Sequence, residues 1–71
     1  MAASKETIKN MLQIIDDAKE GEGWWIDDNF HFEICEDSYE LMKHYSVLDY
    51  FSKAGLKKVA KEILNTGDYK G

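Results

Sequence analysis

The stretch GWWIDDNFHFEICE, residues 23–36, decides the expected fold of this 71-residue chain, and it holds both tryptophans and two of the three phenylalanines. In its second half, from Phe30 to Cys35, apolar and polar residues alternate. Aromatic and β-branched side chains at a period of two are typical of a strand. The first half, from Trp24 to Asp27, alternates in the same way. Asp28-Asn29 lies between the halves, and both residue types tolerate turn conformations. The stretch therefore predicts a β-hairpin.

The length of the hairpin loop follows from which side chains share a face. A two-residue loop at 28–29 would pair Ile26 with His31 and would mix polar with apolar residues on each face. A three-residue loop at 28–30 pairs Ile26 with Phe32 instead. A shift of one residue turns every side chain to the other face, so burial of one face favours the longer loop. The expected apolar face carries Trp24, Ile26, Phe32 and Ile34, and the other face carries Trp25, Asp27, His31, Glu33 and Cys35.

An amphipathic helix is expected before the hairpin, over residues 4–20. Apolar residues recur there at helical spacing, and they are Ile8, Met11, Leu12, Ile15 and Ala18. Ser4 is a residue type that caps helix N-termini. Gly21 and Gly23 are expected to end the helix and release the chain into the hairpin.

Two helices are expected after the hairpin. Asp37, with Glu40 three residues later, is typical of a capping box and predicts a helix over residues 38–53. Its buried stripe would consist of Leu41, Met42, Tyr45, Leu48 and either Phe51 or Ser52. Ala54-Gly55 would end this helix, and a second apolar stripe predicts a short helix over residues 56–65. A single helix kinked near Gly55 is the alternative, and residues 68–71 are expected to fray.

These elements predict the α+β class, as one small domain over residues 1–71 with the order α-β-β-α-α. In this arrangement a two-stranded antiparallel hairpin packs on helices. A lone hairpin is barely stable in water, so the helices would have to cover its apolar face. A chain this short buries a modest core, and oligomerisation or a partner is an expected source of further stability.

The composition narrows the class of function. No apolar run approaches the roughly 20 residues that span a bilayer, and the first residues lead into a polar helical pattern. A single cysteine excludes an internal disulfide framework. Together these features predict a cytoplasmic protein without membrane contact. All nine basic residues are lysine, and arginine is the usual residue for base and phosphate contacts. Direct nucleic-acid binding is therefore not expected.

Cys35, with His31 or His44, is the candidate for nucleophilic or metal chemistry. His31, Glu33 and Cys35 would project from one side of a strand, and His and Cys are good zinc ligands. Closed structural zinc sites need four ligands, and neither a CxxC nor an HExxH spacing is present. A Cys-His nucleophile needs an orienting group, an oxyanion hole and a cleft. We expect no enzyme activity, cofactor or metal site, with a small metal-binding regulator as a lesser alternative.

The net charge of −5 hides an asymmetry along the chain. Residues 16–40 carry ten acidic residues and one lysine, whereas residues 41–71 carry six lysines and three acidic residues. At protein interfaces aromatic residues anchor and charges steer. We therefore expect the acidic segment to bind a basic surface of a partner protein. The expected contact residues are Trp25, Asp27, Asp28, Glu33, Glu36, Asp37 and Glu40.

The general profile of this chain is small, acidic, α+β and free of motifs. It resembles accessory proteins of bacteriophages and mobile elements, including inhibitors of host defence nucleases such as anti-CRISPR proteins. The resemblance is one of type, and it assigns no residue roles. A dense negative surface competes for a groove that neutralises phosphates, so the chain would act as a DNA mimic on a nucleic-acid-handling partner. The alternative is a homodimer assembled through the hairpin edge, with His31 and Cys35 inside the interface.

Overall fold

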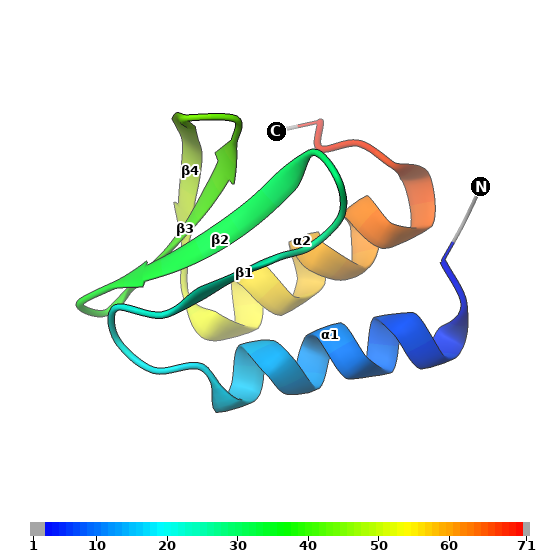
Figure 1. Cartoon of the computed structure of the whole chain (residues 1–71), viewed down its shortest axis with the longest axis horizontal. Helices are drawn as coiled ribbons and strands as arrows, with labels where there is room; N and C mark the ends of the chain where they lie inside the picture. Colours follow the sequence, from blue (N-terminus) through cyan, green and yellow to red (C-terminus); the bar gives the residue numbers. More distant parts are fainter. Residues whose placement is uncertain (1–2, 71) are drawn as a thin grey trace.

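The computed structural model describes residues 3–70 as two helices and a four-stranded sheet. The elements follow the order α1 (Lys5–Asp17), β1 (Gly23–Trp25), β2 (Phe30–Cys35), β3 (Ser38–Lys43), β4 (Ser46–Phe51) and α2 (Lys53–Thr66). The strands form one antiparallel sheet in the order β1-β2-β3-β4. Both helices lie side by side on the same face of this sheet (Figure 1). The prediction of the α+β class is confirmed.

The predicted order α-β-β-α-α with a two-stranded hairpin is wrong, because residues 38–51 form a second hairpin and not a helix. Apolar residues in this segment happen to recur at helical spacing, but many of them are aromatic or β-branched, which favours strands. The turn between β3 and β4 contains no glycine or asparagine that would have predicted a turn here from the sequence. His44 occupies it with a φ of +57°, a conformation that few side chains adopt. Glu36, with a φ of +56°, does the same between β2 and β3, so Asp37 caps no helix.

The predicted β1–β2 register is also wrong. Trp24 stands opposite Phe32 and Trp25 opposite His31, a shift of two residues from the expected pairing of Ile26 with Phe32. The backbone N–H of Ile26 donates to the carbonyl of Phe30, so the loop between them is 27–29. A shift of two leaves every side chain on its predicted face. Phe30 thus belongs to the strand, where it is buried, and not to the loop.

The core lies between the helices and the covered face of the sheet. Phe32 on β2 stands opposite Leu41 on β3, and neither side chain is exposed to solvent. From the helices, Ile15, Leu56 and Ile63 are buried in the same core cluster. The remaining buried core residues are Met11, Ile26, Phe30, Ile34, Ala60 and Leu64. Because only one face of β2 is buried, apolar and polar residues alternate along this strand, and those of the other face remain accessible to solvent.

The caps explain where each helix begins and ends. Ser4 accepts a hydrogen bond from the backbone N–H of Thr7 and begins α1, as expected. Ser52 does the same for α2 by accepting from Gly55, so Ala54-Gly55 lies in the first turn of a helix and ends none. At the other end of α2, Gly67 with a φ of +81° provides the left-handed cap. No helix within residues 3–70 is long and apolar enough to cross a membrane.

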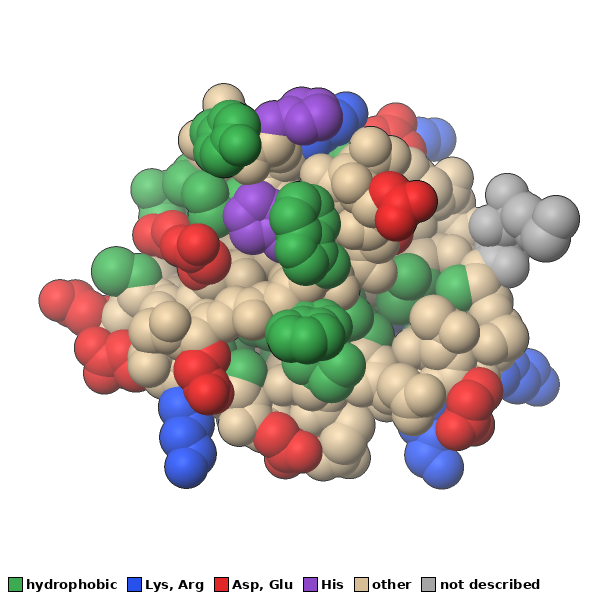
Figure 2. All heavy atoms as spheres, in the orientation of Figure 1, with side chains coloured by type: hydrophobic (Ala, Val, Ile, Leu, Met, Phe, Trp, Pro, Cys, Tyr) green, Lys and Arg blue, Asp and Glu red, His purple; other side chains and the backbone are tan. Residues whose placement is uncertain are grey.

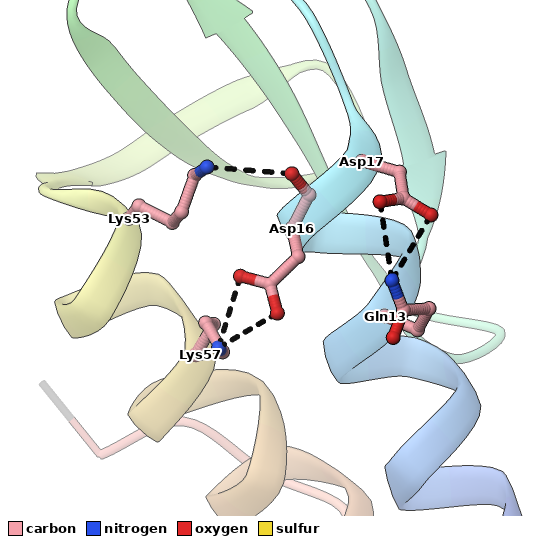
Figure 3. A network of polar contacts seen from close by, with 5 residues as sticks. All are labelled: Gln13, Asp16, Asp17, Lys53 and Lys57. Atoms are coloured by element: carbon pink, nitrogen blue, oxygen red, sulfur yellow. Dashed lines mark hydrogen bonds and ion pairs between the residues drawn. The ribbon is translucent and has the colours of Figure 1, made fainter.

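Polar contacts join α1 to α2 at one end of the helical layer (Figure 3). Lys57 Nζ lies 2.9 Å from Asp16 Oδ1, and Lys53 Nζ donates to the backbone carbonyl of Asp16 at 3.3 Å. Both partners of the ion pair are partly exposed, so the pair contributes about 0–1 kcal/mol. The helix pair is therefore held chiefly by its apolar side chains.

The C-terminal segment after α2 docks against β4 and does not fray as predicted over residues 68–70. The hydroxyl of Tyr69 donates to Asp49 Oδ2 at 2.8 Å. Its ring meets the ring of Phe51 edge-on, with centroids 6.2 Å apart. This hydrogen bond holds the pKa of the Asp49 carboxyl below its usual value, and the backbone N–H of Tyr50 adds to the effect. Residue 71 lies outside the described residues.

Candidate binding face of the sheet

The sheet has one face that no helix covers, and we call it the open face. Side chains on it alternate with the buried ones along β2, and the strand register carries this face across to β1, β3 and β4. They are Trp25 from β1, His31, Glu33 and Cys35 from β2, Ser38, Glu40 and Met42 from β3, and Val47 and Tyr50 from β4. Seen from the side of β1 and α1, exposed hydrophobic side chains gather near the middle of the molecule beside a histidine, with acidic groups around them (Figure 2).

An apolar row crosses the open face from one edge of the sheet to the other. The strand register places Trp25, His31, Met42 and Val47 side by side on the four strands. The rings of Trp25 and His31 lie 4.7 Å apart between centroids and are tilted by 48°. The Nδ1 atom of His31 is shielded from solvent and bonds to no described residue. Trp25 remains 55% exposed, which leaves a large aromatic surface at this end of the row.

An acidic row runs parallel to the apolar one. Glu33 on β2 stands directly opposite Glu40 on β3, and Tyr50 on β4 follows in the same row. Side chains opposite each other in a sheet lie with Cβ atoms about 5 Å apart, and like charges there are destabilising. Among the described residues neither glutamate has a lysine partner. The open face therefore presents unpaired negative charge next to exposed apolar surface.

Charge is divided between the two layers of the fold. Residues 23–51, which contain the sheet and its turns, include seven acidic residues and one lysine. That lysine, Lys43, lies on the covered side, where its Nζ sits 5.3 Å from the centre of the Phe30 ring. Six other lysines lie in α1 and α2. The sheet layer is therefore the negative side of the molecule and the helical layer is the basic side.

The predicted contact residues divide into three groups in the structure. Trp25, Glu33 and Glu40 lie together on the open face. Asp28 lies in the β1–β2 turn, and Glu36-Asp37 forms the β2–β3 turn at the other end of β2. Six strand residues span about 17 Å, so the two turns border the open face at opposite ends.

Asp27 has a structural role in its turn that the sequence did not indicate. Its Oδ1 accepts hydrogen bonds from the backbone N–H groups of Asn29 and Phe30, both at 2.8 Å. This is an Asx turn, in which the side chain replaces a backbone acceptor. Asp28 beside it is exposed and forms no side-chain hydrogen bond with residues 3–70. Both carboxylate oxygens of Asp28 are therefore available to a partner, whereas Asp27 offers only its Oδ2 if the turn hydrogen bonds are kept.

Met42, Val47 and Tyr50 contribute to the open face but were assigned to a helix from the sequence. Tyr50 is 59% exposed and Val47 is 39% exposed. Once residues 38–51 are placed in strands, Met42 shares a face with Glu40 by parity. The bulge between the Leu41 and Met42 pairings brings both Val47 and Tyr50 to that same face. The missing signal was the pair of turns, because Glu36 and His44 occupy the positive-φ positions that glycine or asparagine usually takes.

The candidates for nucleophilic or metal chemistry are not brought together. Cys35 is exposed and stands opposite Ser38, at the end of β2 far from the β3–β4 turn that holds His44. His31 lies four residues along the same strand, about 13 Å away. Within residues 3–70 no three His, Cys, Asp or Glu side chains form a group that could hold a metal ion. Because β2 pairs on both sides, the free edge of the first hairpin is β1 alone.

Comparison of the chain with known proteins identified no related protein. No protein-family model matches the chain, and no curated protein or solved structure matches it either.

Proposed function

We propose that this chain is a non-enzymatic interaction module whose open face binds a basic surface of a partner protein. The observation that carries the proposal is the pair Glu33 and Glu40 next to the exposed ring of Trp25. Among the described residues no lysine forms an ion pair with either glutamate. A partner with lysine or arginine side chains at this position relieves the repulsion and buries the aromatic surface in one step.

The arrangement of the face supports this mode of binding. Interfaces combine a few aromatic anchors with a polar, charged border. Here Trp25, Met42 and Val47 are the apolar centre, and the acidic turns at Asp28 and at Glu36-Asp37 are the border. Charged borders act mainly on the rate of association and on the choice of partner.

A more specific form of the proposal is that the chain blocks a protein that handles nucleic acid. A basic groove that binds phosphates also attracts a dense set of carboxylates. The negative sheet layer offers such a set, and the helical layer, which carries most of the lysines, would face away from the groove. Competition between the chain and short duplex DNA for the captured partner tests this form of the proposal.

The first test is affinity capture from a lysate of the native host with the wild-type chain and a charge-reversal variant. Glu40→Lys replaces a negative charge with a positive one on the open face. Glu62→Lys makes the same exchange on the exposed side of α2 and is the matched control. We expect a partner that is retained by the wild type and Glu62→Lys, released at about 1 M salt, where the screening length is roughly 3 Å, and lost with Glu40→Lys. A partner that binds Glu40→Lys as well as the wild type would overturn the proposal.

A further inference from the structure

The unpaired edge of β1 is a second candidate binding surface, separate from the open face. β1 is the edge strand of the sheet: β2 pairs with one side of it, and no strand pairs with the other side among the described residues (Figure 1). The carbonyl of Glu22 accepts from Ile34, and the N–H of Ile26 donates to Phe30, so these peptide groups point toward β2. In an antiparallel pair the direction alternates at each residue. The peptide groups of Gly23 and Trp25 therefore point outward, away from the sheet.

A hollow lies on each side of this edge. The larger, of about 670 Å³, lies between the second half of α1 and β1, with Ile14, Ala18 and Trp24 among its lining residues. The carboxylates of Asp17 and Glu22 also line it. No lysine does so, and the indole of Trp24 is 59% exposed beside these acidic groups. The hollow therefore suits a long cationic side chain whose stem packs on an aromatic ring.

The smaller hollow, of about 450 Å³, lies on the other side of β1 and includes Trp25, His31 and Glu33. Gly23 stands directly opposite Glu33. A Cβ at Gly23 would come within 2.2 Å of the Phe32 carbonyl oxygen, so the strands can pair this closely only with glycine here. Because Gly23 has no side chain, nothing separates the carboxylate of Glu33 from the free edge.

We propose that β1 receives an extended segment of the partner as a fifth strand, and that this segment carries two successive basic residues. The residue opposite Trp24 would enter the larger hollow and reach Asp17, and the next residue, opposite Gly23, would enter the smaller hollow and reach Glu33. Successive side chains of a strand point to opposite faces, which matches two acidic hollows on opposite sides of one strand. In strand addition the backbone supplies affinity and the hollows supply specificity.

The proposal rests on the proposed function only in taking the partner to be basic. It is tested with a labelled synthetic peptide of alternating threonine and valine that has two successive arginines at its centre. Fluorescence anisotropy should detect binding to the wild-type chain, and the same peptide with two serines at the centre should bind about tenfold more weakly or not at all. Absence of binding by the arginine peptide would overturn the proposal.

Backbone pairing is separated from simple charge attraction by two N-methylated forms of the arginine peptide. Each form carries methyl groups on one of the two alternate sets of amides. The set that faces β1 should lose affinity by about tenfold or more, since its hydrogen bonds to Gly23 and Trp25 are removed, and the other set should bind nearly as the parent does. Equal affinities of the two forms would overturn strand addition.

The hollow between α1 and β1 is tested by Trp24→Ala, with Tyr45→Ala as the matched control. Both side chains are exposed, and Tyr45 lies in the β3–β4 turn. We expect Trp24→Ala to weaken the arginine peptide about tenfold, which is a loss within the usual range for an aromatic anchor, and Tyr45→Ala to leave it unchanged. Unchanged binding by Trp24→Ala would contradict the proposal. The peptide assay does not depend on Glu40, so its failure is distinguishable from failure of the open-face proposal.

Discussion

Glu33 and Glu40 face each other directly across β2 and β3 on the uncovered side of the sheet. Two carboxylates in this position cost the fold stability, and a lysine at either position would form a favourable pair of opposite charges. In the proposed binding mode, the pair lowers the stability of the free protein and attracts the basic partner.

Replacing Glu40 with glutamine should stabilise the free protein. Removing one charge relieves the repulsion across the strand pair, and we expect a gain of about 0.2–1 kcal/mol in the free energy of unfolding. Urea denaturation measures this gain. Glu62→Gln on α2 removes the same charge without a facing carboxylate and should change stability by less than about 0.5 kcal/mol. A destabilised Glu40→Gln would mean that the pair is not repulsive in the folded state.

The central strand should tolerate no loss of volume at Phe32. This side chain is fully buried at the centre of the core, and Phe→Ala substitutions at such sites cost about 3–5 kcal/mol. A domain of this size has a total stability of roughly that amount. Circular dichroism of Phe32→Ala should therefore show a largely unfolded chain at room temperature. The matched variant Trp25→Ala, with the ring more than half exposed, should remain folded.

Asp27 and Asp28 should behave differently although they are adjacent and equally acidic. Asp27→Ala removes two hydrogen bonds that order the β1–β2 turn, and we expect a loss of about 1–2 kcal/mol in the free energy of unfolding. Asp28→Ala should leave stability nearly unchanged. Thermal denaturation of both variants checks the difference, and equal effects would contradict the role assigned to the Asp27 carboxylate.

The hydrogen bond between Tyr69 and Asp49 should make docking of the C-terminal segment depend on pH at both extremes. The pKa of Asp49 is lowered in the folded state, so its contribution is present above the ordinary carboxyl range and lost as pH falls through the lowered pKa. The pKa of Tyr69 is raised, chiefly by the same bond, so that contribution is present below the ordinary tyrosine pKa and lost as pH rises through the raised one.

Carboxyl titration by NMR in the wild type and in Tyr69→Phe tests this contact. The variant keeps the ring against Phe51 and removes only the hydroxyl. The pKa of Asp49 should rise toward its ordinary value in Tyr69→Phe, although the N–H of Tyr50 should still hold it slightly low. An unchanged pKa would show that the hydroxyl does not donate to this carboxylate in solution.

The helices and the first hairpin could be predicted from the sequence because each has a buried face with a clear period. The stripe that contains Met11 and Ile15 indicates α1, and the alternation from Phe30 to Ile34 indicates β2. In β4 all residues except Phe51 are exposed, so no alternation of burial exists there to be read. A bulge between the Leu41 and Met42 pairings disturbs the parity further.

The candidate site could be predicted only in part for the same reason. Trp25 and Glu33 lie on strands that the pattern of residues 23–36 indicates, and their shared face follows from parity alone. The position of Glu40 beside Glu33 depends on the β2–β3 turn, and the positive φ of Glu36 in that turn has no signature in the sequence. The pairing of β2 with β3 therefore determines the position of Glu40, and the local spacing of residues in the sequence does not predict it.

The most direct test of the proposed function is the affinity of the captured partner for three forms of the chain, measured at one salt concentration. The wild type and Glu62→Lys should bind alike, because in the proposed complex the helical layer faces away from the partner. Glu40→Lys should bind about tenfold or more weakly, since a reversed charge repels the basic side chain that the pair attracts. Equal weakening by Glu40→Lys and Glu62→Lys would mean that only net charge matters, and it would contradict binding through the open face.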